Sequence, residues 1–314
     1  MEKESGIELT QKRIKEILLG AGLSEIITYS IVPNNSLEII SSGDIFKDKV
    51  ILDNPLSEEN SLLKNNMVYS LINTAKENIR RQNYDFGLFE AGKIFYREEE
   101  NVIEKIVIAG ILCGKALSDL YEKNNKDISN YDFYYVKGLF EKILDKLLIK
   151  DVNFKEVEMP CLQPGKKAKV IKDNEILGVF GEVNSKVKQN IDISNALYYF
   201  EIDLEKAAML SLPKMMYEKI SKYPSSKRDV SLLIDEKISY DEIMNVINSA
   251  GSKILKDIEL FDKYKGENIQ KGKISLAFHL TYQSDDKTLT EEEINGEHDR
   301  LKALLVKKLK ADIR

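Results

Sequence analysis

The residues best suited to chemistry lie in the last third of the chain, where one tyrosine stands between two lysines. Tyr264, flanked by Lys263 and Lys265, ends a stretch with the pattern of a strand, 258–264. An aromatic ring at a strand end can stack on a nucleic-acid base, and neighbouring ammonium groups can contact phosphates. A tyrosine in this place also suits an ordinary edge or interface aromatic, so the residue types alone leave both roles open.

Further cations and one hydroxyl accompany this tyrosine. We predict RNA contacts for Tyr264, Arg228, Lys222, Lys227, Lys263, Lys265, Lys273, Ser275 and Lys287. The basic side chains would bind phosphate oxygens, and Ser275 would offer a hydrogen bond from an open sheet face. Two alternatives stay open, since Arg228 can form an ion pair within the fold and surface lysines are often merely solvated.

Residue patterns for catalysis or metal binding are missing from the sequence. No Gly-x4-Gly-Lys-Ser/Thr string occurs, so there is no P-loop. The two histidines, His279 and His298, lie far from each other and from Cys113 and Cys161, which excludes zinc-site spacing. We predict no catalytic residue, no metal site and no bound cofactor. We expect His279 on the polar face of a strand, as a surface residue or an RNA contact, and His298 to be structural.

Composition sets the broad class. The chain has 314 residues, 43% hydrophobic and 32% charged, with a net charge of -5, which fits two or three globular domains. Residues 221–314 contain 17 basic and 17 acidic side chains and are neutral, whereas the preceding part is acidic. Two separated cysteines indicate a reducing compartment, and neither a signal peptide nor a membrane-length apolar run occurs. We therefore expect a cytoplasmic protein.

The C-terminal segment, 222–314, predicts β-α-β-β-α with a final short strand. Apolar residues alternate over 229–235 and 274–283, as in strands that bury one face. Ser239 and Thr290, each followed three residues later by glutamate, are capping boxes that begin the two helices. Two helices on one face of an antiparallel sheet make a ferredoxin-like sandwich, and its other face stays open.

The body, 1–205, predicts an α+β domain: a mostly antiparallel sheet with flanking helices. Ser57, after a proline turn, can start a helix, and the turn at 172–175 predicts a hairpin. Residues 206–221, where strand periodicity is lost, are the predicted linker. The expected helices are 11–21, 62–80 and 135–149, and the expected strands are 24–32, 86–96, 102–113, 168–172, 176–183 and 197–204.

Motifs in the C-terminal segment follow one another in a specific order. They are 223–224 (YP), 227–229 (KRD), 260–266 (LFDKYKG), 273–278 (KISLAF) and 288–293 (TLTEEE). This string resembles the anticodon-binding domain of bacterial phenylalanyl-tRNA synthetase beta subunits. The resemblance implies tRNA as a partner, with Tyr264 stacking on an anticodon base.

The body carries motifs of the same family. They are 22–30 (GLSEIITYS), 54–57 (NPLS), 88–92 (LFEAG), 132–133 (DF), 137–138 (KG) with Glu141, 164–165 (PG) and 178–183 (GVFGEV). This region resembles the class II synthetase-like, catalytically silent domain of that subunit. Lys64 stands where the family usually has arginine, and Gln163 where a histidine commonly precedes Pro-Gly.

The arginines of a class II active site are missing from the matching strands. Such a site holds the α-phosphate and the nucleotide tail with two arginines, whose forked guanidinium fits phosphate oxygens. Segments 88–95 and 178–190 contain none, and only Arg97, just past the first, leaves a displaced role open. We therefore predict no catalysis by this chain. The helix 11–21 and its following strand match the class II interface motif, where we expect the alpha-subunit contact.

The resemblance implies a heterotetramer of two alpha and two beta subunits that joins phenylalanine to tRNA-Phe with ATP and Mg²⁺. It also implies that this chain is the C-terminal part of a longer subunit, without the OB-like and editing domains of the N-terminal half. Two other functions stay open. One is a stand-alone RNA-binding or regulatory paralogue, and the other is an independent adenylate-forming enzyme.

Overall fold

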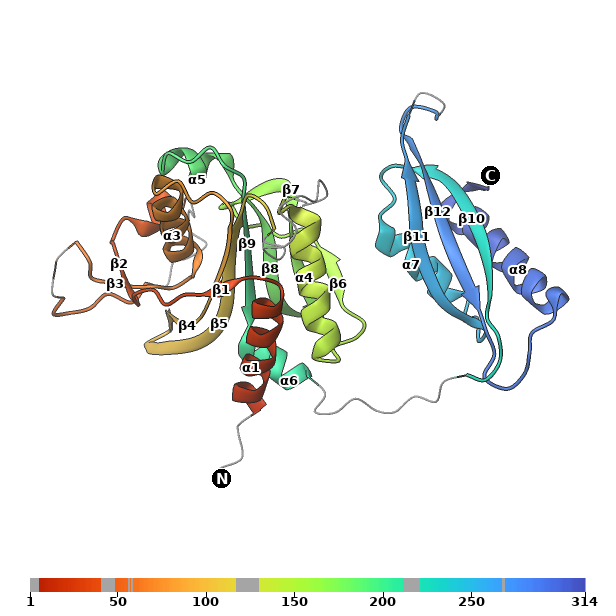
Figure 1. Ribbon diagram of the computed structural model, residues 1–314, viewed down its shortest axis with the longest axis horizontal. Helices are drawn as coiled ribbons and strands as arrows, with labels where there is room; N and C mark the ends of the chain where they lie inside the picture. The colour runs from red at the N-terminus through yellow and green to blue at the C-terminus, as the bar shows by residue number, and fades with distance from the viewer. Residues whose placement is uncertain are drawn as a thin grey trace. The chain divides into compact units, whose positions relative to one another are not determined.

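The computed structural model describes residues 6–40, 49–55, 57, 59–116, 130–211, 221–266 and 269–313. The chain divides into two compact units, Met1–Met215 and Met216–Arg314, and each has its own core (Figure 1). In the described residues no helix is long and apolar enough to cross a membrane.

A seven-stranded sheet with the order β1-β4-β5-β9-β8-β7-β6 organises the first unit. Neighbouring strands run antiparallel except β1 and β4, which are parallel. The strands are β1 (Ser24–Glu25), β4 (Phe86–Glu98), β5 (Asn101–Cys113), β6 (Asn153–Lys155), β7 (Leu162–Lys172), β8 (Glu175–Val183) and β9 (Leu197–Asp203). A separate two-stranded sheet joins β2 (Ile31–Val32) and β3 (Leu62–Leu63).

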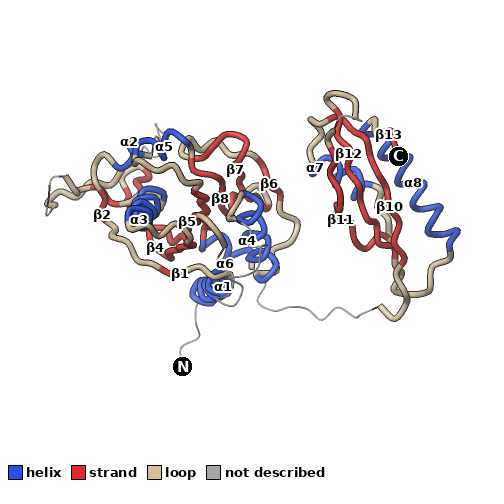
Figure 2. Tube along the Cα trace, turned by 45° about the horizontal axis from the view of Figure 1, so that its top comes forward, coloured by secondary structure: helices blue, strands red, loops and turns tan. Residues whose placement is uncertain are grey.

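Helices cover both faces of the large sheet (Figure 2). Successive strand residues point to opposite faces, so Leu88 and Phe89 enter different cores. Leu88 packs in the core that contains residues of α2 (Ser36–Ile39), α3 (Val68–Arg80) and α5 (Ser185–Asn190). Phe89 packs in the core that contains residues of α1 (Gly6–Gly20), α4 (Phe133–Lys146) and α6 (Leu204–Leu210). The predicted α+β class is confirmed.

Three predicted elements of the first unit are wrong in detail. The expected strand 24–32 is split into β1 and β2, because its first residues pair with β4 and its last with β3. The expected helix 62–80 begins only at Val68, because Leu62 and Leu63 belong to β3. Ser57 begins no helix and instead forms an isolated β-bridge with Asn60.

Two further details differ near the ends of elements. Arg97 lies within β4, near its end, rather than past it. Residues 206–210 of the predicted linker belong to α6, whose first turn is capped by Asp203 through the backbone N–H of Lys206 at 3.0 Å. This helix packs on α1, whereas residues 212–220 lie outside the described part.

The hairpin predicted at 172–175 joins β7 and β8. Asp173 and Asn174 have φ values of +50° and +66°, the left-handed conformation that tight hairpin turns need. Turn chemistry in the sequence was therefore sufficient to place this connection.

The second unit has the predicted order β-α-β-β-α-β. Its four strands form one antiparallel sheet with the order β11-β12-β10-β13. The elements are β10 (Ser226–Asp235), α7 (Tyr240–Ser249), β11 (Leu255–Tyr264), β12 (Lys273–Tyr282), α8 (Glu291–Leu309) and β13 (Asp312–Ile313). Both helices lie on one side of the sheet (Figures 1 and 2), which confirms the ferredoxin-like sandwich.

Both predicted capping boxes begin these helices. The Ser239 hydroxyl accepts a hydrogen bond from the Glu242 backbone N–H, and Thr290 does the same for Glu293. Each glutamate carboxylate in turn accepts a hydrogen bond from the backbone N–H of its cap residue.

Candidate nucleic-acid interface

In the second unit, both helices pack on one face of the sheet, and neither covers the other face. Ile274, Leu276, Phe278, Leu280 and Tyr282 are buried under α7 and α8. The residues between them in β12, together with those opposite them in β10 and β11, form what we call the open face. Its side chains are Lys227, Asp229, Ser231, Leu233 and Asp235 of β10, Asp257, Glu259, Phe261, Asp262 and Tyr264 of β11, and Lys273, Ser275, Ala277, His279 and Thr281 of β12.

Tyr264 reaches the open face because β11 is irregular. Strict alternation from Leu260, which lies opposite buried Phe278, would place Tyr264 on the helix side. A β-bulge between Leu260 and Asp262 shifts the register, so that Tyr264 lies opposite Ser275. The tyrosine side chain is 45% exposed, and its phenol end contacts Gly266, where an added Cβ would clash with the ring.

The predicted RNA-contact residues fall into three places. Tyr264, Ser275, Lys227 and Lys273 lie on the open face. Arg228 and Lys263 lie opposite the buried Leu280 and Leu276, and therefore on the helix side of the sheet. Lys222, Lys265 and Lys287 lie outside the strands: before β10, directly after β11, and shortly before α8.

Carboxylates pair with several of these cations. The Lys273 ammonium lies 2.7 Å from a carboxylate oxygen of Asp312. The other pairs are Arg228 with Glu291, Lys265 with Glu236, and Lys287 with Glu293. Exposed pairs of this kind contribute only about 0–1 kcal/mol, so a phosphate can compete with the carboxylate at low cost. Arg228 also bonds to Ser226, and it ties the first turn of α8 to β10.

Sequence reasoning missed Phe261. Its ring stacks on the imidazole of His279, with centroids 3.8 Å apart and planes 11° from parallel. Nδ1 of His279 lies 2.6 Å from a carboxylate oxygen of Asp229 on the next strand. The alternation of Leu260 inward and Phe261 outward was a signal that could have placed this ring on the open face.

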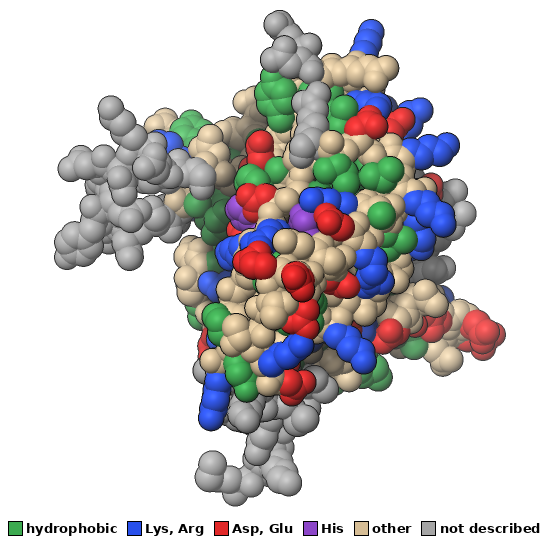
Figure 3. Space-filling model, turned by 90° about the vertical axis from the view of Figure 1, so that its right-hand side faces the viewer, with side chains coloured by type: hydrophobic (Ala, Val, Ile, Leu, Met, Phe, Trp, Pro, Cys, Tyr) green, Lys and Arg blue, Asp and Glu red, His purple; other side chains and the backbone are tan. Residues whose placement is uncertain are grey.

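Charges of both signs are interspersed on the protein surface. Figure 3 shows lysine and arginine side chains next to aspartate and glutamate on the face turned to the viewer. On the open face, the two lysines Lys227 and Lys273 are outnumbered by the carboxylates of Asp229, Asp235, Asp257, Glu259 and Asp262. This face is therefore better suited to stacking and base contacts than to a long run of phosphates.

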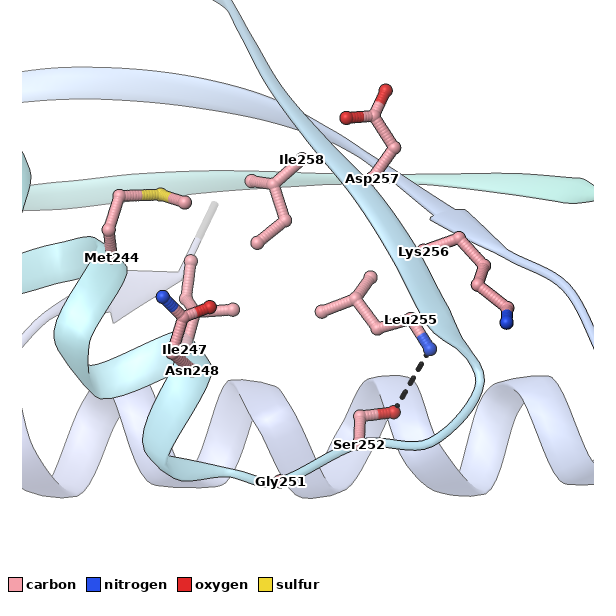
Figure 4. Close-up of a pocket in the computed structure, with 9 residues that line it drawn as sticks. All are labelled: Met244, Ile247, Asn248, Gly251, Ser252, Leu255, Lys256, Asp257 and Ile258. Atoms are coloured by element: carbon pink, nitrogen blue, oxygen red, sulfur yellow. Dashed lines mark hydrogen bonds between the residues drawn. The ribbon is translucent and has the colours of Figure 1, made fainter. Parts of the chain in front are cut away.

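A pocket of about 320 Å³ lies on the helix side of β11 (Figure 4). It lies between α7, which contributes Met244 and Ile247, and the edge strand, which contributes Leu255 and Ile258. The Ser252 hydroxyl accepts a hydrogen bond from the Leu255 backbone N–H at 3.2 Å. Asn248, Lys256 and Asp257 also line it, so the lining is mixed polar and apolar.

The first unit holds a buried ion pair between Lys64 and Glu90, and Glu90 lies in the segment 88–95 that lacks an arginine. Nζ of Lys64 lies 2.9 Å from Oε1 of Glu90 and 3.2 Å from Oγ1 of Thr28. Thr28 also donates a hydrogen bond of 2.7 Å to Oε2 of Glu90. The side chains of Lys64 and Glu90 are only 2% and 4% exposed. Lys64, where the resemblance leads us to expect an arginine, therefore neutralises a carboxylate of this chain.

The other departure from the family pattern also has a partner within the chain. The side-chain oxygen of Gln163 accepts a hydrogen bond from the backbone N–H of Ser185, the first residue of α5, at 3.3 Å. Arg97 is exposed at the end of the β4–β5 hairpin, beside its register partner Val102.

The remaining groups with catalytic potential are poorly suited to it. Burial raises the pKa of the Cys113 thiol to about 11 and that of Cys161 to about 12, so both stay protonated. His298 is buried, its Nδ1 lies 3.1 Å from the Tyr282 hydroxyl, and desolvation lowers its pKa. Among the described residues, no group of three or more His, Cys, Asp or Glu side chains could hold a metal ion.

The sequence matches two family models that together cover most of the chain. Residues 1–204 match the phenylalanyl-tRNA synthetase beta chain CLM domain. Residues 221–314 match the ferredoxin-fold anticodon binding domain. Among curated proteins, the chain is 34% identical over 97% of its length to the phenylalanine–tRNA ligase beta subunit of Bacillus licheniformis. It is also 34% identical over 96% of its length to the beta subunit of Syntrophotalea carbinolica.

The chain belongs to the phenylalanine–tRNA ligase beta subunit family. It covers 37% and 38% of the length of these two relatives, so it spans just over a third of each. The predicted family is therefore confirmed, and the two units correspond to two of its domains.

One solved structure shares the fold over about two thirds of the chain. Pyrrolysyl-tRNA synthetase from Desulfitobacterium hafniense superposes with a TM-score of 0.50 and 14% identity over 65% of this chain and 68% of that protein. At this identity the likeness concerns the fold, and it agrees with a synthetase-like sheet in a beta-subunit family member.

Proposed function

We propose that this chain docks tRNA-Phe through its anticodon and scaffolds the catalytic alpha subunit of phenylalanine–tRNA ligase. The observation that carries the proposal is the open face with exposed Tyr264, in a unit that matches an anticodon-binding domain. An aromatic ring on an uncovered sheet is the usual means of holding an unpaired base.

The RNA would cross the open face. Tyr264 would stack on an anticodon base, Ser275 opposite it would hydrogen-bond that base or its sugar, and Lys227 would contact phosphate. The remaining predicted residues would act at the margins: Lys273, Lys222, Lys265 and Lys287 through phosphates, and Arg228 and Lys263 from the helix side around the strand ends. Arg228 also has its structural role at α8.

The segment after α1 is the proposed contact for the alpha subunit. Ile27 and Tyr29 are 92% and 89% exposed, although both are large and apolar. The Thr28 hydroxyl between them donates a hydrogen bond to the buried carboxylate of Glu90, which anchors the backbone that carries them. Adjacent exposed apolar side chains on a fixed backbone suit a protein partner. The contact therefore centres on the loop between β1 and β2.

The assembled ligase, as proposed here, is a heterotetramer of two alpha and two beta subunits that works in the cytoplasm. ATP and Mg²⁺ would be used by the alpha subunit to join phenylalanine to tRNA. This chain would not catalyse the reaction, because the segments 88–95 and 178–190, where the phosphate-holding arginines of a class II site are expected, contain no arginine.

Binding of labelled tRNA-Phe at moderate and high salt tests the RNA part of the proposal. We expect salt-sensitive binding, since phosphate contacts release counterions. Tyr264→Ala should weaken it by roughly 5- to 150-fold, the equivalent of ~1–3 kcal/mol per stacked base. Binding that is equally strong in Tyr264→Ala would place the anticodon elsewhere.

Co-purification tests the scaffold part and the rival function. An alpha subunit should be retained by this chain, and Ile27→Asp with Tyr29→Asp should release it. A chain that binds RNA but retains no alpha subunit would favour the stand-alone paralogue. That alternative is not favoured at present, because the relatives over almost the whole chain are ligase beta subunits.

A further inference from the structure

Phe261 and His279 form a stacked ring pair that has no role so far in the proposed RNA contact. The two ring planes are nearly parallel, and the ring centroids lie 3.8 Å apart. Phe261 is 47% exposed, and it is not among the side chains that build the core of its unit. An apolar ring held half in water adds little to folding, so stability alone gives no reason for phenylalanine here.

The imidazole behind Phe261 is held in a fixed orientation. Asp229 lies directly opposite His279 in the pairing of β10 and β12, and its carboxylate bonds to Nδ1 at 2.6 Å. Three adjacent strands thus supply one side chain each to a row: Asp229, His279 and Phe261. A ring fixed before a ligand arrives loses less entropy on binding.

The surroundings of Phe261 select for a base rather than a phosphate. His279 covers one face of the phenyl ring, and the exposed remainder is available to a ligand. Glu259 and Asp262, its neighbours on β11, lie opposite His279 and Ala277 and therefore on the same face. Carboxylates repel phosphates, but they accept hydrogen bonds from the amino groups of bases.

We propose that Phe261, backed by His279 and Asp229, is a second stacking site for an unpaired RNA base, separate from Tyr264. The inference rests on the proposed function and deepens it. Ser275, opposite Tyr264, and His279 are four residues apart in β12, which corresponds to about 13 Å. Adjacent stacked bases are only about 3.4 Å apart, so the two sites hold different bases of one strand.

The test uses the 314-residue chain and an RNA hairpin with the anticodon arm of tRNA-Phe. 2-Aminopurine is placed at one loop position at a time, because its fluorescence changes when it stacks on a ring. The variants are Phe261→Leu, Tyr264→Leu and, as a matched control, Tyr84→Leu, an equally exposed aromatic of the first unit at 47%.

With the unchanged chain, 2-aminopurine fluorescence should change on binding at two loop positions. Phe261→Leu should remove one response and weaken binding roughly 5- to 150-fold, whereas Tyr264→Leu should remove the other. Tyr84→Leu should change neither. Asp229→Ala should diminish the same response as Phe261→Leu, and Asp229→Asn, which can still hold the imidazole, should largely retain it.

The outcomes separate this inference from the proposed function. If Phe261→Leu keeps both responses and full affinity while Tyr264→Leu loses one, the second site is overturned and anticodon binding stands. If the unchanged chain shows no RNA binding, or if neither ring matters, the open face is not the RNA site and both proposals are overturned.

Discussion

The two units use a sheet in opposite ways. In the first, α1, α4 and α6 cover one face and α2, α3 and α5 cover the other, so seven strands lie between two apolar cores. In the second, α7 and α8 cover one face only. A sheet covered on both sides offers contacts through its loops, whereas a half-covered sheet offers the strands themselves. We therefore expect a protein partner on the first unit and an RNA on the second.

The two sheets also differ in where they place a pair of polar side chains. Lys64 and Glu90 neutralise each other in the interior of the first unit, out of reach of any ligand. On the second unit, Asp229 and His279 form a pair at the surface, next to exposed rings. A side-chain pair thus lies in the interior of one unit and at the surface of the other, where we propose that it orients a contact surface.

Removing the buried lysine should give the largest effect and test whether the first unit is a rigid scaffold. Lys64→Ala leaves Glu90 buried without its cation, which costs about 3–5 kcal/mol. Urea unfolding of the whole chain, followed by a probe in the first unit, measures the change.

The matched control for Lys64 is Lys93→Ala on β4. Lys93 pairs with Glu104 at 2.6 Å, but both side chains are 54% exposed, so the expected loss is about 0–1 kcal/mol. Similar losses in the two variants would contradict the assignment of Lys64 to the interior.

The proposed RNA surface of the second unit can be disturbed without replacing an aromatic residue. Gly266→Ala adds a methyl group against the phenol end of Tyr264 and should displace the ring. We expect tRNA affinity to fall roughly tenfold, within the range for one stacked base, with the unit still folded.

Gly296→Ala in α8 is the glycine control, because nothing lies within 4 Å of its added Cβ. It should leave RNA binding unchanged and stabilise the helix by about 0.5–1 kcal/mol. A loss of RNA affinity in this control would point to a general disturbance of the unit rather than to Tyr264.

A helix cap sharpens the comparison between the two faces of the second unit. Ser239→Ala removes the cap of α7, on the covered side, and should cost about 1 kcal/mol of unfolding free energy. Equilibrium denaturation measures the loss, and tRNA affinity under native conditions should stay the same. A parallel drop in affinity would mean that the helices take part in RNA binding.

The smallest expected effect is a pH dependence from the interior of the second unit. Burial lowers the pKa of His298 in the folded chain, so the unfolded state takes up a proton first as the pH falls. Stability from the neutral imidazole is present above the ordinary histidine pKa of about 6.5 and is lost as pH falls toward the lower folded value. Thermal unfolding measured from roughly pH 7.5 down to about pH 5, on either side of the ordinary histidine pKa, should show this loss of stability.

His298→Gln separates this histidine from the carboxylates that titrate at lower pH. Glutamine stays neutral and can still bond to the Tyr282 hydroxyl, so the variant should show a flatter pH profile. A profile identical to that of the unchanged chain would assign the pH dependence to other groups.

Local signals in the sequence were enough for most elements of the second unit. The alternation of β12 is confirmed over its whole length, and both capping boxes begin the expected helices. These features depend on residues within a few positions of each other. The first unit was harder, since the expected strand 24–32 changes partners midway, from β4 to β3, and both partners lie far along the chain.

The candidate site shows the same division. Tyr264 and Ser275 could be proposed from residue types and family motifs, and the register places Lys227 and Lys273 on the open face with them. Arg228 and Lys263 lie on the helix side, a placement that follows from strand register. Phe261 was overlooked because its partner, His279, belongs to another strand.

The sequence by itself determined the order of elements in the second unit, its two helix caps, the hairpin turn at 172–175 and the lack of arginine in the segments that match a class II phosphate clamp. Tertiary structure alone decided that Phe261 and Tyr264 share a face. Residues three positions apart in a regular strand point to opposite sides, and the bulge between Leu260 and Asp262 reverses this. The hydrogen bonds to β12 fix that bulge. Likewise, only the folded sheet brings Lys64 to Glu90, where a buried carboxylate needs a cation.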